Sequence, residues 1–108
     1  VHLSLDGEFI GVVTSGLKLP AGAHIHKDWL LVGELKGSVS VVDKVGKVIA
    51  TLGVNSDPQQ AGRNGVAPSL WKEGIVTAPH GITSNAAGDI FVAEWNAHGR
   101  VHRFNLSK

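Results

Sequence analysis

Hydrophobic positions along this chain fall in short runs, and several of these runs alternate, as in Val1–Leu5, while Trp29–Gly33 is apolar enough for a buried strand. Alternation of this kind is typical of a strand that buries one face. Turn signals such as Asp6-Gly7 and Lys44-Val45-Gly46 separate the runs. The pattern predicts strands over residues 1–5, 8–14, 22–26, 29–34, 37–43, 46–52, 81–84, 89–95 and 99–105.

No stretch of useful length keeps the i, i+3, i+4, i+7 spacing of an amphipathic helix. The 14 glycines are spread along the chain, where they weaken helices and favour tight turns between strands. The chain is therefore predicted to be all-β. Its 108 residues are enough for one small domain.

Residues 54–77 break the alternation, because Gly, Pro, Asn and Gln occur throughout them without a steady period. A loop of this length is uncommon in a compact domain and tends to be functional or disordered. Leu70, Trp71 and Ile75 are the residues that could attach it to the body of the domain. Packing is the default role of a tryptophan, but Trp71 stands beside two charged residues and is a candidate for contact with a ligand or partner.

Two stretches of the chain, about sixty residues apart, repeat one another, and repeats of short antiparallel strands are typical of solenoids, arrays or propeller blades. The matches are Leu19-Pro20-Ala21-Gly22 with Ala78-Pro79-His80-Gly81, Leu30–Glu34 with Ile90–Glu94, and Gly37-Ser38-Val39 with Gly99-Arg100-Val101.

The repeat divides the chain into units with different numbers of predicted strands. Residues 17–53 contain four strands, as one propeller blade requires. Residues 78–108 contain three, and residues 1–16 contain two that match the third and fourth strands of a blade. The chain is therefore expected to begin and end within a blade.

The second repeat carries a family resemblance. Pro-His-Gly-Ile at 79–82, Gly-Asp-Ile-Phe-Val-Ala-Glu-Trp at 88–95 and Gly-Arg-Val-His-Arg-Phe at 99–104 resemble the NHL repeat, which builds six-bladed β-propellers from four-stranded antiparallel blades. Residues 19–52 resemble it more weakly. The resemblance implies a single partial propeller: the end of one blade at 1–16, a complete blade at 17–53, a long loop at 54–77 and three strands of a final blade at 78–108.

About two blades do not close a ring, so edge strands and inner faces would lie open. Three interpretations follow: a piece of a longer chain, a naturally truncated gene, or a subunit that completes a ring by self-association. Position 1 is Val rather than Met, as expected of a processed or partial chain. Three copies would supply roughly the blades of an NHL ring, although the overlap of third-strand sequence at both ends counts against simple closure.

His80 is the first candidate for chemistry. It is predicted to begin the innermost strand of its blade, and its position resembles the Pro-His-Gly metal-binding histidine of peptidyl-hydroxyglycine amidating lyases, which are also six-bladed. In that family, histidines from different blades converge on zinc, and three imidazoles leave a fourth position open for water or substrate. This sequence departs from the family in the first unit, where Ala21 stands at the equivalent position. The alternative is that His80 caps the strand or hydrogen-bonds a channel water.

His24 and His26 are separated by one residue, so they share one face of the predicted strand. This spacing occurs in zinc and copper sites. Together with His80 they are the candidate ligands for zinc or another divalent metal, with a further ligand needed from missing blades or another subunit. The competing interpretation gives them a solvated or core-edge role. His98 and His102 are predicted to lie at the surface without a chemical role.

Glu34 and Glu94 stand where NHL repeats usually carry an aspartate, at the end of the second strand. In the family that carboxylate generally braces turns through backbone N–H bonds and a neighbouring arginine. Arg100 is the predicted partner of Glu94. The pair is expected to maintain the blade rather than to act in acid–base catalysis.

The net charge of +1 argues against a basic surface for binding nucleic acid, because the ten Lys and Arg residues are scattered among nine acidic residues. No apolar run has the length needed to cross a bilayer, and no signal-peptide pattern opens the chain. Without cysteine there are no disulfides or thiolate metal sites. Hydrophobic residues at 43% and charged residues at 18% fit a folded, soluble chain, and many proteins with this resemblance are bacterial and exported, so an extracytoplasmic location is one expectation.

Two functions remain open at this point. The first is a non-enzymatic scaffold or binding module for a protein, peptide or small molecule, associated with the remaining blades of a ring or with further copies of itself. The second is a metal-dependent lyase- or hydrolase-like enzyme with His80 as a ligand in the central channel.

Overall fold

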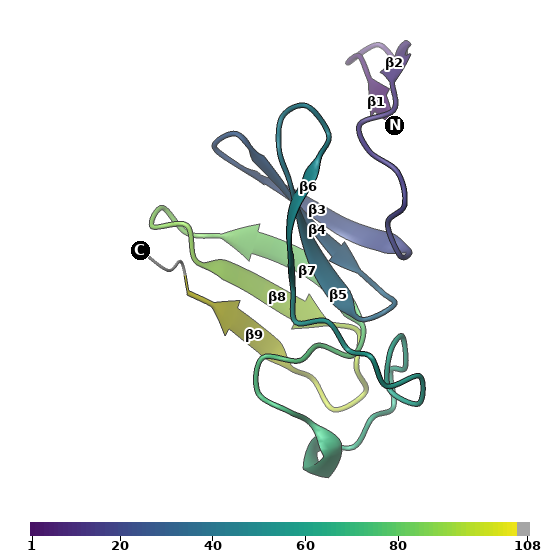
Figure 1. Cartoon of the computed structure of the whole chain (residues 1–108), viewed down its shortest axis with the longest axis vertical. Coiled ribbons are helices and arrows are strands. Elements are labelled where there is room, and N and C mark those ends of the chain that lie inside the picture. The colour runs from purple at the N-terminus through teal and green to yellow at the C-terminus, as the bar shows by residue number, and fades with distance from the viewer. Residues whose placement is uncertain (106–108) are drawn as a thin grey trace.

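The computed structural model describes residues 1–105, which fold into three antiparallel sheets (Figure 1). The predicted all-β class is confirmed. The described residues contain one short 3-10 helix, η1 (Pro68–Leu70), and none long and apolar enough to cross a membrane. The strands are β1 (His2–Leu3), β2 (Phe9–Gly11), β3 (Pro20–His26), β4 (Trp29–Glu34), β5 (Ser38–Val42), β6 (Val48–Leu52), β7 (Pro79–Ser84), β8 (Ile90–Glu94) and β9 (Val101–Phe104).

Each sheet joins strands in chain order through tight turns. The order is β1-β2 in the first, β3-β4-β5-β6 in the second and β7-β8-β9 in the third. Between β5 and β6, the Asp43 carboxylate accepts the backbone N–H groups of Val45 and Lys47 at 3.0 and 2.9 Å, and Gly46 adopts a φ of 88°. A side chain that substitutes for backbone acceptors and a glycine with positive φ are what a tight turn requires.

The four-stranded and three-stranded sheets repeat one another in register. Pro20 pairs with Glu34 as Pro79 pairs with Glu94, and an irregularity follows each proline. Gly22 then pairs with Gly33 as Gly81 pairs with Ala93. The sequence repeat is therefore also a structural repeat.

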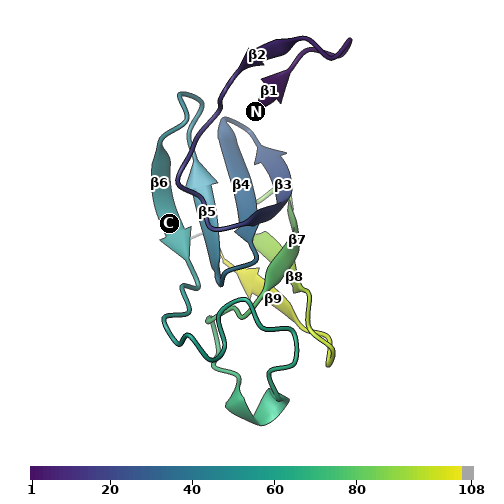
Figure 2. The ribbon, with the colours of Figure 1, turned by 90° about the vertical axis from the view of Figure 1, so that its right-hand side faces the viewer.

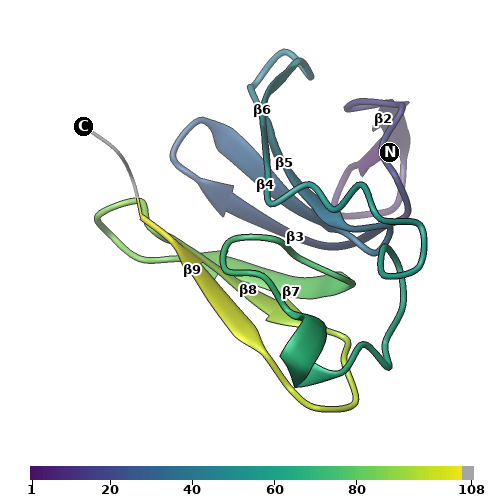
Figure 3. The same cartoon turned by 60° about the horizontal axis from the view of Figure 1, so that its bottom comes forward.

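These two sheets pack face to face around one hydrophobic core (Figure 3). Leu31, Val39 and Val92 are at most 1% exposed. Burying one such side chain stabilises the fold by about 1.5–3 kcal/mol, so this layer is the main source of stability. The core comprises Leu31, Val39, Val41, Ile90 and Val92, with Leu52, Ile82 and Phe104 packed against it.

Strands β3 and β7 lie side by side and run in the same direction. A Cβ atom added to Gly22 would overlap the carbonyl oxygen of His80, which shows how closely the two backbones approach. Four residues further along both strands, Nδ1 of His26 lies 3.1 Å from Oγ of Ser84. The first strands of the two sheets therefore meet along their length.

The small hairpin of β1 and β2 stands apart from the two larger sheets as an arm (Figures 1 and 2). Its strands are shorter than the predicted 1–5 and 8–14, and almost all of its residues are exposed. A two-stranded hairpin has little to pack against, so regular pairing ends early. Within residues 1–105 the sheets do not close into a ring, and ring closure stays a prediction.

The predicted long loop leaves β6 and returns to β7 along a defined path. Its two ends are tied together, because the Val76 N–H donates to the Gly53 carbonyl at 3.0 Å. It is also tied to the four-stranded sheet, since the Asn55 N–H donates to the Gly37 carbonyl at 2.8 Å. The loop is therefore an ordered part of the fold.

Candidate functional site

Two buried glutamates, at the ends of β4 and β8, hold the segment that precedes the first strand of their own sheet. Oε1 of Glu34 accepts the Lys18 N–H at 3.0 Å. Oε1 of Glu94 accepts the Ala78 N–H at 2.9 Å and also the N–H and hydroxyl of Thr77. We call each arrangement a glutamate clasp, because one carboxylate fastens the start of a sheet to the end of its second strand.

The second oxygen of each glutamate has different partners in the two clasps. Oε2 of Glu34 accepts hydroxyl groups from Ser38 and, at 3.2 Å, from Ser40. Oε2 of Glu94 lies 3.0 Å from Nε2 of His102 and 3.6 Å from Nη1 of Arg100. The first clasp therefore uses neutral donors, and the second uses groups that carry or can carry positive charge.

These contacts set the ionisation of Glu94. Burial alone would raise the pKa of this carboxyl, but hydrogen bonds from His102, the backbone of Thr77 and Ala78, and the Thr77 hydroxyl lower the pKa to about 2. An ionised carboxylate only accepts hydrogen bonds, so Nε2 of His102 is the donor. Glu94 is therefore held as an anion within the sheet.

Arg100 extends the second clasp to the long loop. Its Nη2 donates to the Lys72 carbonyl at 2.6 Å, and its guanidinium lies 4.9 Å from the centre of the Trp71 ring. Nε1 of Trp71 donates in turn to the Val66 carbonyl at 3.0 Å. Trp71 is half-buried and serves to fasten the loop, so only part of its ring is left for a ligand or partner.

The histidines singled out in the sequence lie on the two neighbouring first strands. His80 is exposed on β7. Residues 22, 24 and 26 are the half-buried positions of β3, and His26 contacts Ser84, so His24 and His26 lie on the face of β3 that looks toward β7. Within residues 1–105, no three His, Asp or Glu side chains are grouped so that they could hold a metal ion.

The prediction that His102 lies at the surface is wrong, because this residue is 7% exposed and bonded to Glu94. The sequence did contain a signal. His102 pairs with Val92 as Ser40 pairs with Val32, so alternation places its side chain on the same face of the sheet as Glu94. The prediction for His98 agrees with its exposure.

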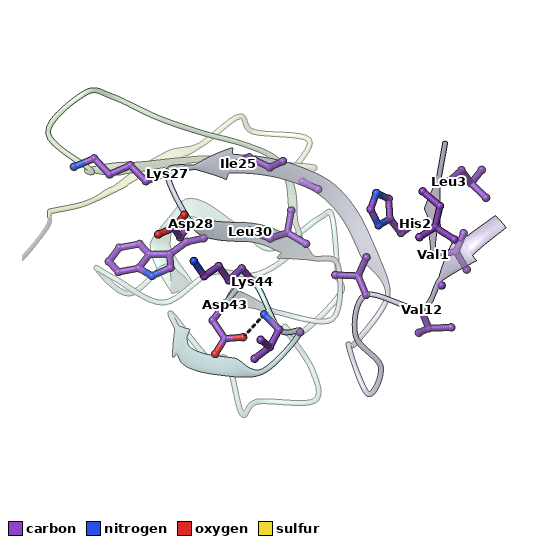
Figure 4. A pocket seen from close by; sticks show the side chains of 17 residues that line it. Val1, His2, Leu3, Val12, Ile25, Lys27, Asp28, Leu30, Asp43 and Lys44 are labelled. Atoms are coloured by element: carbon purple, nitrogen blue, oxygen red, sulfur yellow. Dashed lines mark hydrogen bonds between the residues drawn. The ribbon is translucent and has the colours of Figure 1, made fainter. Parts of the chain in front are cut away.

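A groove of about 780 Å³ separates the arm from the outer face of β3 and β4 (Figure 4). Apolar side chains line most of it, including Leu3, Val12, Ile25 and Leu30. Charged side chains of both signs stand along its other side. The sequence analysis did not anticipate this groove, since it depends on how the arm sits beside the sheet.

No family model, curated protein or solved structure matches this chain.

The pair of His102 and Glu94 has the composition of a general-base dyad, in which a carboxylate orients an imidazole. A working base must present its free nitrogen to a substrate. Here Nε2 is occupied by Glu94, and both residues are less than 10% exposed. The arrangement suits a fastening role better than proton transfer.

Proposed function

We propose that this chain is an NHL-type β-propeller scaffold, a non-enzymatic binding module whose two larger sheets are consecutive blades. The observation that carries this proposal is the glutamate clasp, which recurs at the same register position in two sheets packed face to face. Repeated units that bury a shared core between neighbours are the construction principle of repeat proteins. Such a unit associates with the remaining blades of a longer protein or with further copies of itself.

The distribution of polar groups favours binding over catalysis. The buried carboxylates Glu34 and Glu94 are occupied by the clasps. The long loop, in contrast, forms a cavity of about 530 Å³ in which Asp57, Gln60 and Arg63 stand beside apolar Val66 and Leu70. Mixed polar and apolar linings of this kind suit a peptide, protein or small-molecule ligand.

A metal analysis of the purified protein tests this proposal. After incubation with excess zinc and exhaustive dialysis against non-chelating buffer, we expect no stoichiometric metal and no change in thermal unfolding. The matched variant His80→Ala should behave in the same way. One tightly held zinc per chain or per assembly that His80→Ala removes would overturn the scaffold in favour of the alternative below.

The alternative is a metal-dependent lyase- or hydrolase-like enzyme. One observation favours it: His80 lies on β7, and His24 and His26 lie on the adjacent β3, so imidazoles from two units occupy neighbouring strands. Ligands from further units or copies would complete the coordination of zinc or another divalent metal. In that case activity would depend on His80 and on the added metal.

A further inference from the structure

Two unlike charges stand apart in the cavity of the long loop. Asp57 and Arg63 both line this space of about 530 Å³. Within residues 1–105, no ion pair joins them, and the Arg63 guanidinium has no acidic side chain within ion-pair distance. Charges that share a cavity without pairing with each other can each meet an opposite charge on a bound molecule. The cavity therefore suits a ligand that carries both signs of charge.

Asp57 is held in place by the turn that it begins. Its Oδ1 accepts the Gln59 N–H at 2.9 Å, and its carbonyl accepts the N–H groups of Gln60 and Ala61 at 3.0 and 2.9 Å. Its own N–H donates to Oδ1 of the buried Asn55 at 3.0 Å. Among residues 1–105 these bonds engage one carboxylate oxygen, so Oδ2 remains to accept a donor from a ligand.

Gln60 and Arg63 bring hydrogen-bond donors to the same cavity. Oε1 of Gln60 accepts Nδ2 of Asn55 at 3.2 Å, which orients the amide and leaves its NH2 group to donate. The Arg63 N–H donates to the Gln60 carbonyl at 2.9 Å, so both side chains leave one ordered turn. A guanidinium binds a carboxylate through two parallel hydrogen bonds. These donors therefore favour a carboxylate as the anionic group of the ligand.

Val66 and Leu70 give the cavity its apolar part, and Leu70 is 57% exposed. The backbone that carries them is fixed, because the Val66 carbonyl accepts Nε1 of Trp71 at 3.0 Å. The preceding turn is fixed as well, since the Gly62 N–H donates to the Thr77 carbonyl at 2.8 Å. A site that is already ordered loses little conformational entropy when a ligand binds. An aliphatic side chain of a ligand can therefore pack on Leu70 without rearranging the loop.

We propose that this cavity binds a short zwitterionic peptide with aliphatic side chains and both termini free. The peptide carboxylate binds the Arg63 guanidinium and the Gln60 amide, and the peptide ammonium group binds Oδ2 of Asp57. A cavity of this volume lies within the range of about 300–1,000 Å³ that small ligands occupy. An internal segment of a protein carries neither terminal charge, so the separated charges favour a free peptide. The inference rests on the proposed scaffold function, to which it gives a ligand.

Isothermal titration calorimetry with the dipeptide leucyl-leucine tests this proposal. The unmodified chain is expected to bind it at one site per chain. N-acetyl-leucyl-leucine and leucyl-leucine amide each lack one terminal charge, and each should bind about tenfold more weakly because one charged hydrogen bond is lost. The absence of binding at millimolar leucyl-leucine, or equal binding of the capped peptides, would overturn the proposal.

Matched variants assign each terminal charge to its partner. Arg63→Gln should bind leucyl-leucine and its amide equally, and Asp57→Asn, which keeps an oxygen for the turn, should bind leucyl-leucine and its N-acetyl form equally. Lys44→Gln removes an exposed positive charge outside this cavity and should bind as the unmodified chain does. An Arg63→Gln protein that still prefers the free carboxylate, or an equal loss in Lys44→Gln, would contradict the assignment. Failure here leaves the scaffold proposal standing, because that proposal is decided by metal content.

Discussion

The two glutamate clasps hold the same backbone junction with different chemistry. Ser38 and Ser40 donate hydroxyl hydrogen bonds to Glu34, whereas Glu94 pairs with His102 through a hydrogen bond and with Arg100 through charge at 3.6 Å. The hydroxyl groups give the first clasp only neutral donors, whereas Arg100 brings a positive charge to the anion of the second. The backbone geometry therefore needs a carboxylate, but it does not dictate which residues bind the other carboxylate oxygen.

The largest expected loss in the free energy of unfolding comes from replacing Glu94, and it distinguishes the two clasps. Glu94→Gln leaves Arg100 and His102 without their anion and should reduce the free energy of unfolding by about 3 kcal/mol. Glu34→Gln keeps an oxygen acceptor for neutral donors and should cost about 1 kcal/mol. Urea denaturation of both variants at neutral pH measures the difference. Equal losses would mean that the charged partners add nothing to the second clasp.

A smaller loss of stability is expected from replacing Gly22, and none from replacing the equivalent Gly81. Gly22→Ala forces the backbones of β3 and β7 apart and should cost about 2 kcal/mol, as overpacking usually does. Gly81→Ala meets only an ordinary contact within one chain and should leave the monomer as stable or slightly more stable. Urea denaturation of both variants measures this comparison. A stable Gly22→Ala protein would contradict the close approach.

The smallest of the three effects is a pH dependence of stability that arises from the clasp of Glu94 alone. The folded pKa of Glu94, about 2, lies below its ordinary value of 4.5, so its contribution to stability is complete above pH 4.5 and is lost as the pH falls toward 2. Between about pH 4.5 and pH 3 we expect a loss on the order of 1 kcal/mol. Glu94→Gln should remove this component, and Glu34→Gln should retain it. An unchanged acid transition in Glu94→Gln would rule out Glu94 as its source.

The all-β class and the repeat were accessible from the sequence because the alternation, the turn signals and the repeated motifs Pro20-Ala21-Gly22 and Pro79-His80-Gly81 are local. Residues 90–94 lie within a predicted strand, and the structure has β8 there, with burial that alternates along it. The resemblance to the NHL repeat predicts that Arg100 is the partner of Glu94, and the two groups lie 3.6 Å apart. Local patterns therefore predict the strands, whereas this contact was predicted from the resemblance.

Features that depend on how the sheets pack against each other could not be predicted from local sequence patterns. The sequence predicts His102 at the surface, because nothing in an edge strand shows which layer packs against it, yet His102 is buried. The groove beside Ile25 and the overlap at Gly22 arise from contacts between segments far apart in the chain. Register within a sheet fixes which face a residue takes, but only the packing of layers decides whether that face is covered.

The hydrogen bond from Val76 to Gly53 has a consequence for how this protein can change over time. It closes the base of the excursion between β6 and β7, and further hydrogen bonds at Asn55 and Lys72 tie parts of the intervening segment to the sheets. Lengthening a closed excursion costs little entropy, about 0.6 kcal/mol per doubling. New recognition sequences can therefore be inserted between these ties while the stacked layers stay undisturbed.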